Sequence, residues 1–158
     1  MTWAVVPAAG RGARFGSELP KQYLEVAGRP LIAHTLDVLL SHPSVNGVMV
    51  VLAADDRHWR GWETLDGKRI ATCTGGAERA DSVLAGLNAL PDTVRADEFV
   101  LVHDAARPFV DQAIISAVVA AAREGCGALP GVPVGDTLKE TDAALRVTKK
   151  PFMASMIY

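Results

Sequence analysis

A glycine-rich segment that also carries cationic side chains offers the clearest chemistry in this chain. Residues 6–21 read VPAAGRGARFGSELPK and follow a short apolar run at residues 3–6. Glycine lets a backbone approach a ligand closely, and successive free N–H groups in such a loop form a concave site for an anion. The side chains of Arg11, Arg14 and Lys21 add positive charge to the same segment. The segment therefore predicts a phosphate-binding loop at the carboxyl end of a first strand.

The spacing in this segment differs from that of two well-known phosphate loops. A Walker loop needs Gly-Lys-Ser/Thr, whereas Lys21 lies between Pro20 and Gln22. A dinucleotide fingerprint opens directly into a helix, but here the third glycine, Gly16, comes one place late and Pro20 breaks the expected helix. A dinucleotide-dependent oxidoreductase is therefore disfavoured. A surface loop without a role is disfavoured too, because structureless loops of about 15 residues are uncommon and usually functional.

The composition fits a single domain and argues against several kinds of partner. The chain has 158 residues, of which 49% are hydrophobic and 22% charged, enough for one buried core. A net charge of −2 argues against attachment to nucleic acid or to an anionic membrane. There is no signal-peptide pattern, no apolar run of transmembrane length, and no ligand-type motif beside Cys73 or Cys126. We therefore expect a protein of the reducing cytoplasm.

Apolar runs alternate with helical patterns along the chain, which predicts an α/β fold with a mostly parallel central sheet. The expected helices are residues 30–40, 80–90 and 112–123, and residues 54–62 form a polar connection. The expected strands are residues 3–6, 48–52, 70–73 and 99–103, followed by a last, irregular core strand at 128–134. Because crossovers between parallel strands are right-handed, the loops that follow the strands should meet at one edge of the sheet.

Four segments of the chain resemble, in order, the motifs of sugar-phosphate nucleotidyltransferases. They read PAAGRGARFGSELPKQYL at residues 7–24, TGGAERADSVLAGL at 74–87, VLVHDAARPF at 100–109 and PVGDTLK at 133–139. More narrowly, they are similar to those of the 2-C-methyl-D-erythritol 4-phosphate cytidylyltransferase family of the non-mevalonate route to isoprenoids. The resemblance runs from residue 3 to residue 141 or so, and the tail at residues 147–158 departs from it.

The resemblance implies a Rossmann-like three-layer sandwich of the nucleotide-diphospho-sugar transferase type, incomplete at its C-terminal end. It implies a nucleotidyltransferase domain over residues 1–140, followed at 141–158 by the start of a dimerisation arm and a divergent tail. Family members dimerise through that arm, so a homodimer is expected. Later family segments supply a second carboxylate for the metal, and this chain has no match to them, so it looks truncated at its C-terminus.

The resemblance also assigns roles in binding CTP. Arg14 and Lys21 match the two family cations that stabilise the transition state of nucleotidyl transfer. Nucleotide binding is implied for a first group, Pro7, Ala8, Ala9, Gly10, Arg11 and Gly12, and for a second group, Gly75, Gly76, Ala77, Arg79 and Ser82. The second group would read the cytosine edge through backbone groups and a serine hydroxyl. Many members carry an acidic residue where this chain has Ala77.

The segment around Asp104 is implied to hold the metal and the second substrate. Asp104 would be a ligand of Mg²⁺, with Mn²⁺ as an alternative, since Mg²⁺ takes a few carboxylates together with phosphate oxygens. Contacts with a polyol phosphate are implied for Asp104, Ala105, Arg107 and Thr137, and the planar guanidinium of Arg107 suits its phosphate. His103 is expected to make a structural hydrogen bond, because an anionic phosphate nucleophile needs no general base.

These roles imply magnesium-dependent transfer of a cytidylyl group from CTP to 2-C-methyl-D-erythritol 4-phosphate, giving 4-diphosphocytidyl-2-C-methyl-D-erythritol and pyrophosphate. Two alternatives stay open. One is a cytidylyltransferase for ribitol 5-phosphate, although such enzymes more often show HDAVRP than the HDAARP found at residues 103–108. The other is a catalytically inactive nucleotide-binding or dimerisation fragment, which the missing second carboxylate favours.

Overall fold

The computed structural model describes residues 2–10, 19–133, 139–149 and 155–157. The chain divides into two compact units, residues 1–116 and 117–158. The expected domain boundary at residue 140 concerns the family domain and stays a prediction. Within the described ranges, no helix combines the length and the apolar character needed to cross a membrane.

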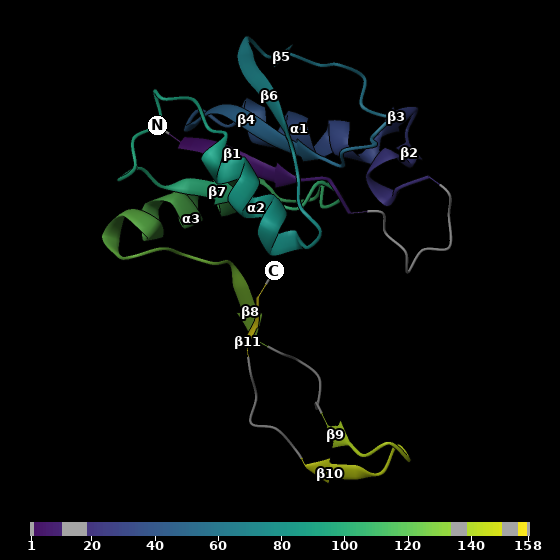
Figure 1. The fold of residues 1–158 in the computed structure, drawn as a ribbon. Helices are drawn as coiled ribbons and strands as arrows, with labels where there is room; N and C mark the ends of the chain where they lie inside the picture. Colours follow the sequence, from purple (N-terminus) through teal and green to yellow (C-terminus); the bar gives the residue numbers. More distant parts are fainter. Residues whose placement is uncertain (1, 11–18, 134–138, 150–154, 158) are drawn as a thin grey trace. The chain divides into compact units, whose positions relative to one another are not determined.

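A five-stranded sheet forms the centre of the first unit, with the strand order β5-β6-β4-β1-β7 (Figure 1). Its strands are β1 (Thr2–Pro7), β4 (Val45–Leu52), β5 (Thr64–Leu65), β6 (Lys68–Thr74) and β7 (Val100–Val102). Strand β1 pairs in parallel with both β4 and β7, β4 pairs in parallel with β6, and the short β5 runs antiparallel at the edge. The predicted α/β fold with a mostly parallel sheet is therefore confirmed.

Helices cover both faces of this sheet. Figure 1 draws α2 (Arg79–Asn88) in front of the sheet and α1 (Leu31–Ser41) behind it, which gives three layers. The chain between β1 and α1 contains a 3-10 turn, η2 (Lys21–Tyr23), and a small hairpin of β2 (Glu25–Val26) and β3 (Arg29–Pro30). Helix α3 (Gln112–Glu124) begins where the Asp111 carboxylate accepts a hydrogen bond from the Ile114 N–H at 2.7 Å, which caps the helix.

The apolar runs explain why β1 and β4 lie in the middle. Strand β1 is buried along five of its six residues, and β4 buries six of its eight. A strand that is covered on both faces needs a continuous apolar sequence rather than an alternating one, and both runs have that character. Helix α1 completes one side with Ile32, Leu36 and Leu39, which are spaced as one face of a helix and are fully buried.

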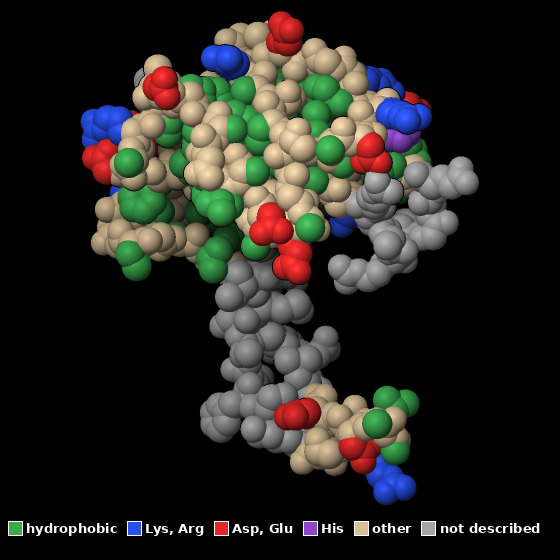
Figure 2. All heavy atoms as spheres, in the orientation of Figure 1, with side chains coloured by type: hydrophobic (Ala, Val, Ile, Leu, Met, Phe, Trp, Pro, Cys, Tyr) green, Lys and Arg blue, Asp and Glu red, His purple; other side chains and the backbone are tan. Residues whose placement is uncertain are grey.

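On the face drawn in Figure 2, the charged side chains of the described residues are scattered rather than gathered by sign. On the face of the described residues drawn in Figure 2, hydrophobic and polar atoms mix over α2, and basic side chains lie singly near the outline. The exposed apolar side chains of α2 include Leu84 and Leu87. This distribution agrees with the small net charge of −2 and offers no broad basic stripe on that face.

The second unit differs most from the sequence-based expectation. The segment 128–134 was expected to form a last core strand, but β8 (Gly131–Pro133) pairs antiparallel with β11 (Ser155–Ile157) in a separate two-stranded ladder. Proline at residues 130 and 133 removes two backbone donors, which disfavours an interior position in a larger sheet. A further hairpin, β9 (Glu140–Thr141) with β10 (Val147–Lys149), has no counterpart in the expected elements.

A glycine sets how closely α2 approaches the sheet. A Cβ atom built on Gly86 would lie 2.6 Å from a Val5 methyl carbon and 2.7 Å from a Val51 methyl carbon. Those separations are shorter than carbon atoms tolerate, so no larger residue fits without moving the helix away from β1 and β4.

We expect Gly86→Ala to destabilise the protein by about 1–3 kcal/mol, because overpacking outweighs the better helix propensity of alanine. The measurement is the free energy of unfolding from urea denaturation. Gly125→Ala is the matched control, since the nearest atom to a Cβ there is the Ala121 carbonyl oxygen at 4.0 Å. Equal stabilities for the two variants would contradict the close approach of α2.

Candidate active site

Three of the four motifs begin where parallel strands of the central sheet end. One hydrogen bond continues the sheet just past each strand: Ala8 N–H to Val51 O at 2.8 Å, Gly75 N–H to Leu52 O at 2.8 Å, and His103 N–H to Val5 O at 3.0 Å. The loops that follow β1, β6 and β7 therefore leave the same edge of the sheet. The predicted convergence is confirmed for these three motifs. The fourth motif falls mainly on residues 134–138, outside the described part of the chain.

The phosphate loop is described at its two ends. The backbone of residues 7–10 leaves β1, and the chain returns at residue 19 to enter the turn η2, where Lys21 is exposed. Gln22 is 4% exposed, and its side-chain Nε2 donates to the Ala8 carbonyl at 2.7 Å and to the Gly10 carbonyl at 3.3 Å. The two ends of the loop are thus joined by one buried amide. The predicted residues Arg11, Gly12 and Arg14 lie outside the described residues.

The segment that follows β6, predicted to read the base, lies close to the backbone that follows β1. A Cβ on Gly75 would lie 2.7 Å from Ser82 Oγ and 2.9 Å from Ala9 Cβ, so the Gly75 backbone lies close against both side chains. Ser82 is buried on α2, and its N–H donates to the Glu78 carbonyl at 3.0 Å. The structure therefore brings together three predicted nucleotide-binding residues from two separate motifs.

The start of α2 is fixed by its own side chains, so the segment that precedes it has a defined path. The Asp81 carboxylate accepts a hydrogen bond from the Glu78 N–H at 3.1 Å, which satisfies one of the free donors at the helix start. Gly76 and Ala77, also predicted to bind the nucleotide, are exposed just before this cap. Their backbone groups are accessible at the edge of the sheet.

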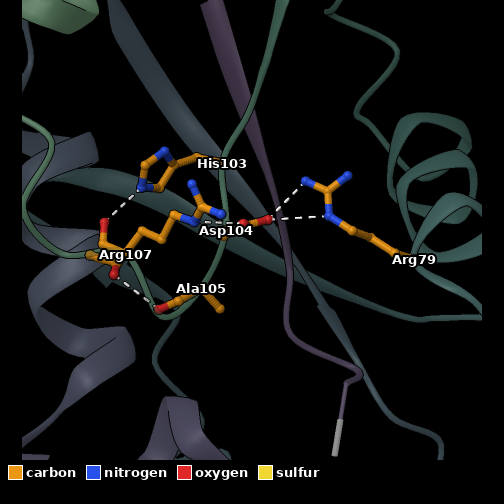
Figure 3. A network of polar contacts seen from close by, with 6 residues as sticks. Arg79, His103, Asp104, Ala105 and Arg107 are labelled. Carbon is orange, nitrogen blue, oxygen red and sulfur yellow. Dashed lines mark hydrogen bonds and ion pairs between the residues drawn. The ribbon is translucent and has the colours of Figure 1, made fainter. Parts of the chain in front are cut away.

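Asp104 lies between two arginines from different motifs (Figure 3). Arg79 donates from Nη2 and Nε to Asp104 Oδ1 at 2.8 and 3.2 Å, and Arg107 Nε lies 2.9 Å from Oδ2. Burial alone would raise the pKa of the Asp104 carboxyl. The hydrogen bonds and charge of Arg79, with the charges of Arg107 and His103, instead hold that pKa below its usual range. Asp104 is therefore an anion, and both guanidinium groups are held at the edge of the sheet.

Neutral hydrogen bonds fix the backbone around Asp104. Thr35, fully buried on α1, donates from Oγ1 to the Ala105 carbonyl at 2.9 Å. The Arg107 N–H donates to the Asp104 carbonyl at 3.2 Å and closes the turn. His103 Nε2 is 2.8 Å from the Arg107 carbonyl, which can only accept, so this nitrogen carries the proton. The structural hydrogen bond expected of His103 is confirmed.

Two of the residues that hold these loops, Gln22 and Thr35, were not predicted from the sequence. Gln22 and Thr35 each reach a backbone carbonyl, and the partners lie 14 and 70 residues away along the chain. The only signal for Gln22 in the sequence was its place next to Lys21, a predicted catalytic residue. Thr35 breaks an otherwise apolar face of α1, which marks it as a polar group in need of a partner.

The described residues offer little for a metal beyond Asp104. Within them, no group of three or more His, Cys, Asp or Glu side chains is arranged to hold a metal ion. One carboxylate still suits Mg²⁺, which commonly takes one or two protein carboxylates and completes its shell with phosphate oxygens and water. A carboxylate has about four lone-pair sites on its two oxygens, so the arginine contacts do not exhaust those of Asp104.

A parallel sheet with a glycine-rich loop, a cationic turn and an ion-paired carboxylate at its carboxyl edge defines an α/β protein of the nucleotide-binding class. The family model described as 2-C-methyl-D-erythritol 4-phosphate cytidylyltransferase (IspD) matches residues 2–155 of this sequence. The chain belongs to that family. The match extends beyond residue 141, where the resemblance carried by the motifs was expected to end, and takes in most of the tail.

Individual relatives agree with this family. The 2-C-methyl-D-erythritol 4-phosphate cytidylyltransferase of Stenotrophomonas maltophilia strain R551-3 is 60% identical over 138 residues, which are 87% of this chain and 60% of the relative. That of Xylella fastidiosa strain M23 is 58% identical over 141 residues, with the same two shares. The chain therefore spans about three fifths of the length of these curated relatives.

Solved structures agree as well. The Francisella tularensis 2-C-methyl-D-erythritol 4-phosphate cytidylyltransferase matches 99% of this chain with a TM-score of 0.77 and 25% identity, and 69% of that structure is covered. The enzyme of the same name from Thermus thermophilus matches 96% of this chain with a TM-score of 0.66 and 32% identity, over 66% of its own length. The predicted three-layer fold of this transferase type is thereby confirmed.

The ion pairs of Asp104 lead to a prediction about its titration. We expect its carboxyl pKa to lie below about 3.9, the value of a free aspartate, and to rise in an Arg79→Gln variant. The stabilisation from ionised Asp104 is present above the unfolded-state pKa and is lost as pH falls through the lower folded-state pKa. The measurement is the side-chain carboxyl chemical shift of Asp104 against pH by NMR. Arg95→Gln is the control, because Arg95 pairs with Asp97 instead; an unchanged Asp104 pKa in Arg79→Gln would contradict the pairing.

Proposed function

We propose that the chain transfers a cytidylyl group from CTP to 2-C-methyl-D-erythritol 4-phosphate and releases pyrophosphate. The contact between Gly75, Ala9 and Ser82 carries this proposal, because it joins the phosphate loop to the segment that would read the base. A nucleotide held along these residues would have its triphosphate over the glycine-rich loop. The relatives at 58–60% identity are 2-C-methyl-D-erythritol 4-phosphate cytidylyltransferases, which supports the same reaction.

The proposed reaction is a substitution at phosphorus. A phosphate oxygen of the polyol phosphate attacks the α-phosphorus of CTP, and the bond from that phosphorus to the bridging oxygen of pyrophosphate breaks. The attacking phosphate is already anionic, so the protein supplies alignment and positive charge rather than a base. Lys21, exposed on a turn that is held to the phosphate loop, and Arg14 are the proposed transition-state cations. Arg107, more than half exposed beside Asp104, is the proposed clamp for the polyol phosphate.

We propose Asp104 as the protein ligand for Mg²⁺, or Mn²⁺ in its place. A bound divalent cation would neutralise charge on the triphosphate as pyrophosphate leaves. Arg79 and Arg107 keep the Asp104 carboxylate ionised, and a cation that binds there would use a remaining lone pair or displace one of the two arginines. Thr137 remains a proposed contact of the polyol phosphate.

We also propose that the protein works in the cytoplasm as a homodimer. Residues 140–148 of the hairpin formed by β9 and β10 are exposed, and Leu145 at its tip is 82% exposed. An apolar side chain at the end of an exposed hairpin is a suitable contact for a second copy. The hairpin lies in the segment that resembles the family's dimerisation arm.

A second candidate function is nucleotide binding without turnover. It is favoured by two observations: both oxygens of Asp104 are paired with arginines, and no group of three or more His, Cys, Asp or Glu among the described residues is arranged to hold a metal ion. Such a protein would bind CTP through the same loops and release no pyrophosphate. The two functions are therefore separated by measuring binding and turnover on the same preparation.

The test is pyrophosphate release from CTP and Mg²⁺ with and without 2-C-methyl-D-erythritol 4-phosphate. We expect release that requires the polyol phosphate and falls by about 100-fold or more in Arg14→Ala and in Lys21→Ala, since each removes charge from the transition state. Arg123→Ala, a change at an exposed cation on α3, is the matched control and should keep full activity. Ribitol 5-phosphate as a competing acceptor tests the substrate class.

Binding of CTP without pyrophosphate release from a folded preparation would favour the second candidate. Faster release with ribitol 5-phosphate than with the erythritol phosphate would overturn the proposed substrate. Equal activity in Lys21→Ala and Arg123→Ala would remove Lys21 from the catalytic machinery.

A further inference from the structure

We propose that Gln22 is a positioning residue for nucleotidyl transfer, which fixes the start of the phosphate loop, at Ala8 and Gly10, against the turn that carries Lys21. The inference rests on the proposed function, because it names what sets the geometry of that site. Gln22 is buried and lies next to Lys21, the proposed catalytic cation. Its side-chain amide donates hydrogen bonds to Ala8 and Gly10, at the other end of the loop.

The orientation of the Gln22 amide follows from its partners. Both contacts are backbone carbonyl oxygens, which can only accept, so Nε2 and not Oε1 faces Ala8 and Gly10. Glutamine suits this position because one nitrogen carries two hydrogens and no charge. A cationic side chain here would lose its hydration at a high cost in free energy. A carboxylate would place its oxygens against the two carbonyl oxygens, with no hydrogen to share.

The hydrogen bond to Ala8 also sets a donor that a phosphate could use. A trans peptide points its C=O and its N–H in opposite directions. Because the Ala8 carbonyl turns toward Gln22, the N–H of Ala9 in the same peptide turns away from Gln22. Holding one carbonyl inward therefore holds one loop amide outward, as an anion site built from backbone groups requires.

The turn that carries Gln22 is anchored on its other side, so the side chain has a firm base. Tyr23 is buried and donates from its hydroxyl to Asp56 Oδ2 at 2.7 Å. The other oxygen of Asp56 accepts from the N–H groups of His58 and Trp59, both at 2.9 Å. Burial, together with the hydrogen bond and charge of Asp56, raises the pKa of Tyr23 far above its usual value, so the phenol stays a donor. The connection after β4 therefore fixes the turn through Tyr23. Gln22, on the same turn, fixes the backbone of Ala8 and Gly10.

The same turn directs neighbouring side chains to opposite environments. Lys21 is exposed while Gln22 and Tyr23 are buried. A change that releases Gln22 from Ala8 and Gly10 would shift the loop backbone relative to Lys21, although neither proposed phosphate-binding group is itself altered. Small errors of alignment cost large factors in rate, so the effect should fall on kcat.

The test compares two matched substitutions, Gln22→Glu and Gln112→Glu. Both glutamine side chains donate from Nε2 to a backbone carbonyl, which makes the pair comparable. Gln112 donates to the Val38 carbonyl at 2.9 Å, and this hydrogen bond is exposed. Under the pyrophosphate assay, Gln22→Glu should lose about 100-fold in kcat while the KM for the polyol phosphate changes by less than about threefold. Gln112→Glu should keep the kcat of the parent chain.

The pH profile separates positioning from a loss of folding. A protonated glutamic acid offers one O–H donor, so the activity of Gln22→Glu relative to the parent chain should rise as pH falls from 8 toward about 5.5, the range in which a buried Glu gains its proton. The folded fraction is measured by circular dichroism at each pH. Gln22→Met, which keeps the volume and has no donor, should show the loss of kcat without the rise at low pH.

The outcomes distinguish this inference from the proposed function. Turnover by the parent chain with equal kcat in Gln22→Glu and Gln112→Glu overturns the inference and leaves the function standing. If the parent chain binds CTP without turnover, the proposed function fails. The role of Gln22 is still supported in that case if the Kd for CTP rises about tenfold in Gln22→Glu and is unchanged in Gln112→Glu. Equal CTP affinities in that case, or no CTP binding by the parent chain, overturn it.

Discussion

The parallel pairing of β1 with both β4 and β7 is the constraint on which the rest of the first unit depends. A strand paired on both edges and covered on both faces has no exposure to water, so its sequence must be apolar, and the run at residues 2–7 meets that demand. Parallel pairing also sends every strand end to one edge. The loops of three motifs therefore leave the sheet at the same edge.

Neutral and charged side chains have different roles at this edge of the sheet. Buried side chains without charge hold backbone carbonyls: Gln22 holds Ala8 and Thr35 holds Ala105. The cationic groups of Lys21, Arg79 and Arg107 stay more exposed. A buried neutral hydrogen bond has little competition from water and fixes a position well, whereas a partly exposed guanidinium keeps its charge available for an incoming phosphate.

The sequence predicted the elements whose pattern is local. The strands β1 and β4 follow from unbroken apolar runs, and α1 follows from a broad apolar face after Pro30. The strand expected at 128–134 was wrong about its partner, because an apolar run reveals burial and not which strand lies beside it. The contacts of Gln22, Thr35 and the Arg79–Asp104 pair join residues 14 to 70 positions apart, and no local periodicity contains that information. Arg79 and Asp104 were assigned to separate tasks, whereas the structure joins them through an ion pair.

The crowded backbone at Gly75 limits how this site can vary over evolutionary time. Any side chain at that position would meet Ser82, Ala9 and Val51, which belong to three different elements of the fold. Ala77, two positions further on, is exposed. A lineage that changed what this segment binds would therefore have to accept substitutions at its exposed residues. The close-packed glycine would stay the same, so inherited variation in the segment should be found at the exposed positions and not at Gly75.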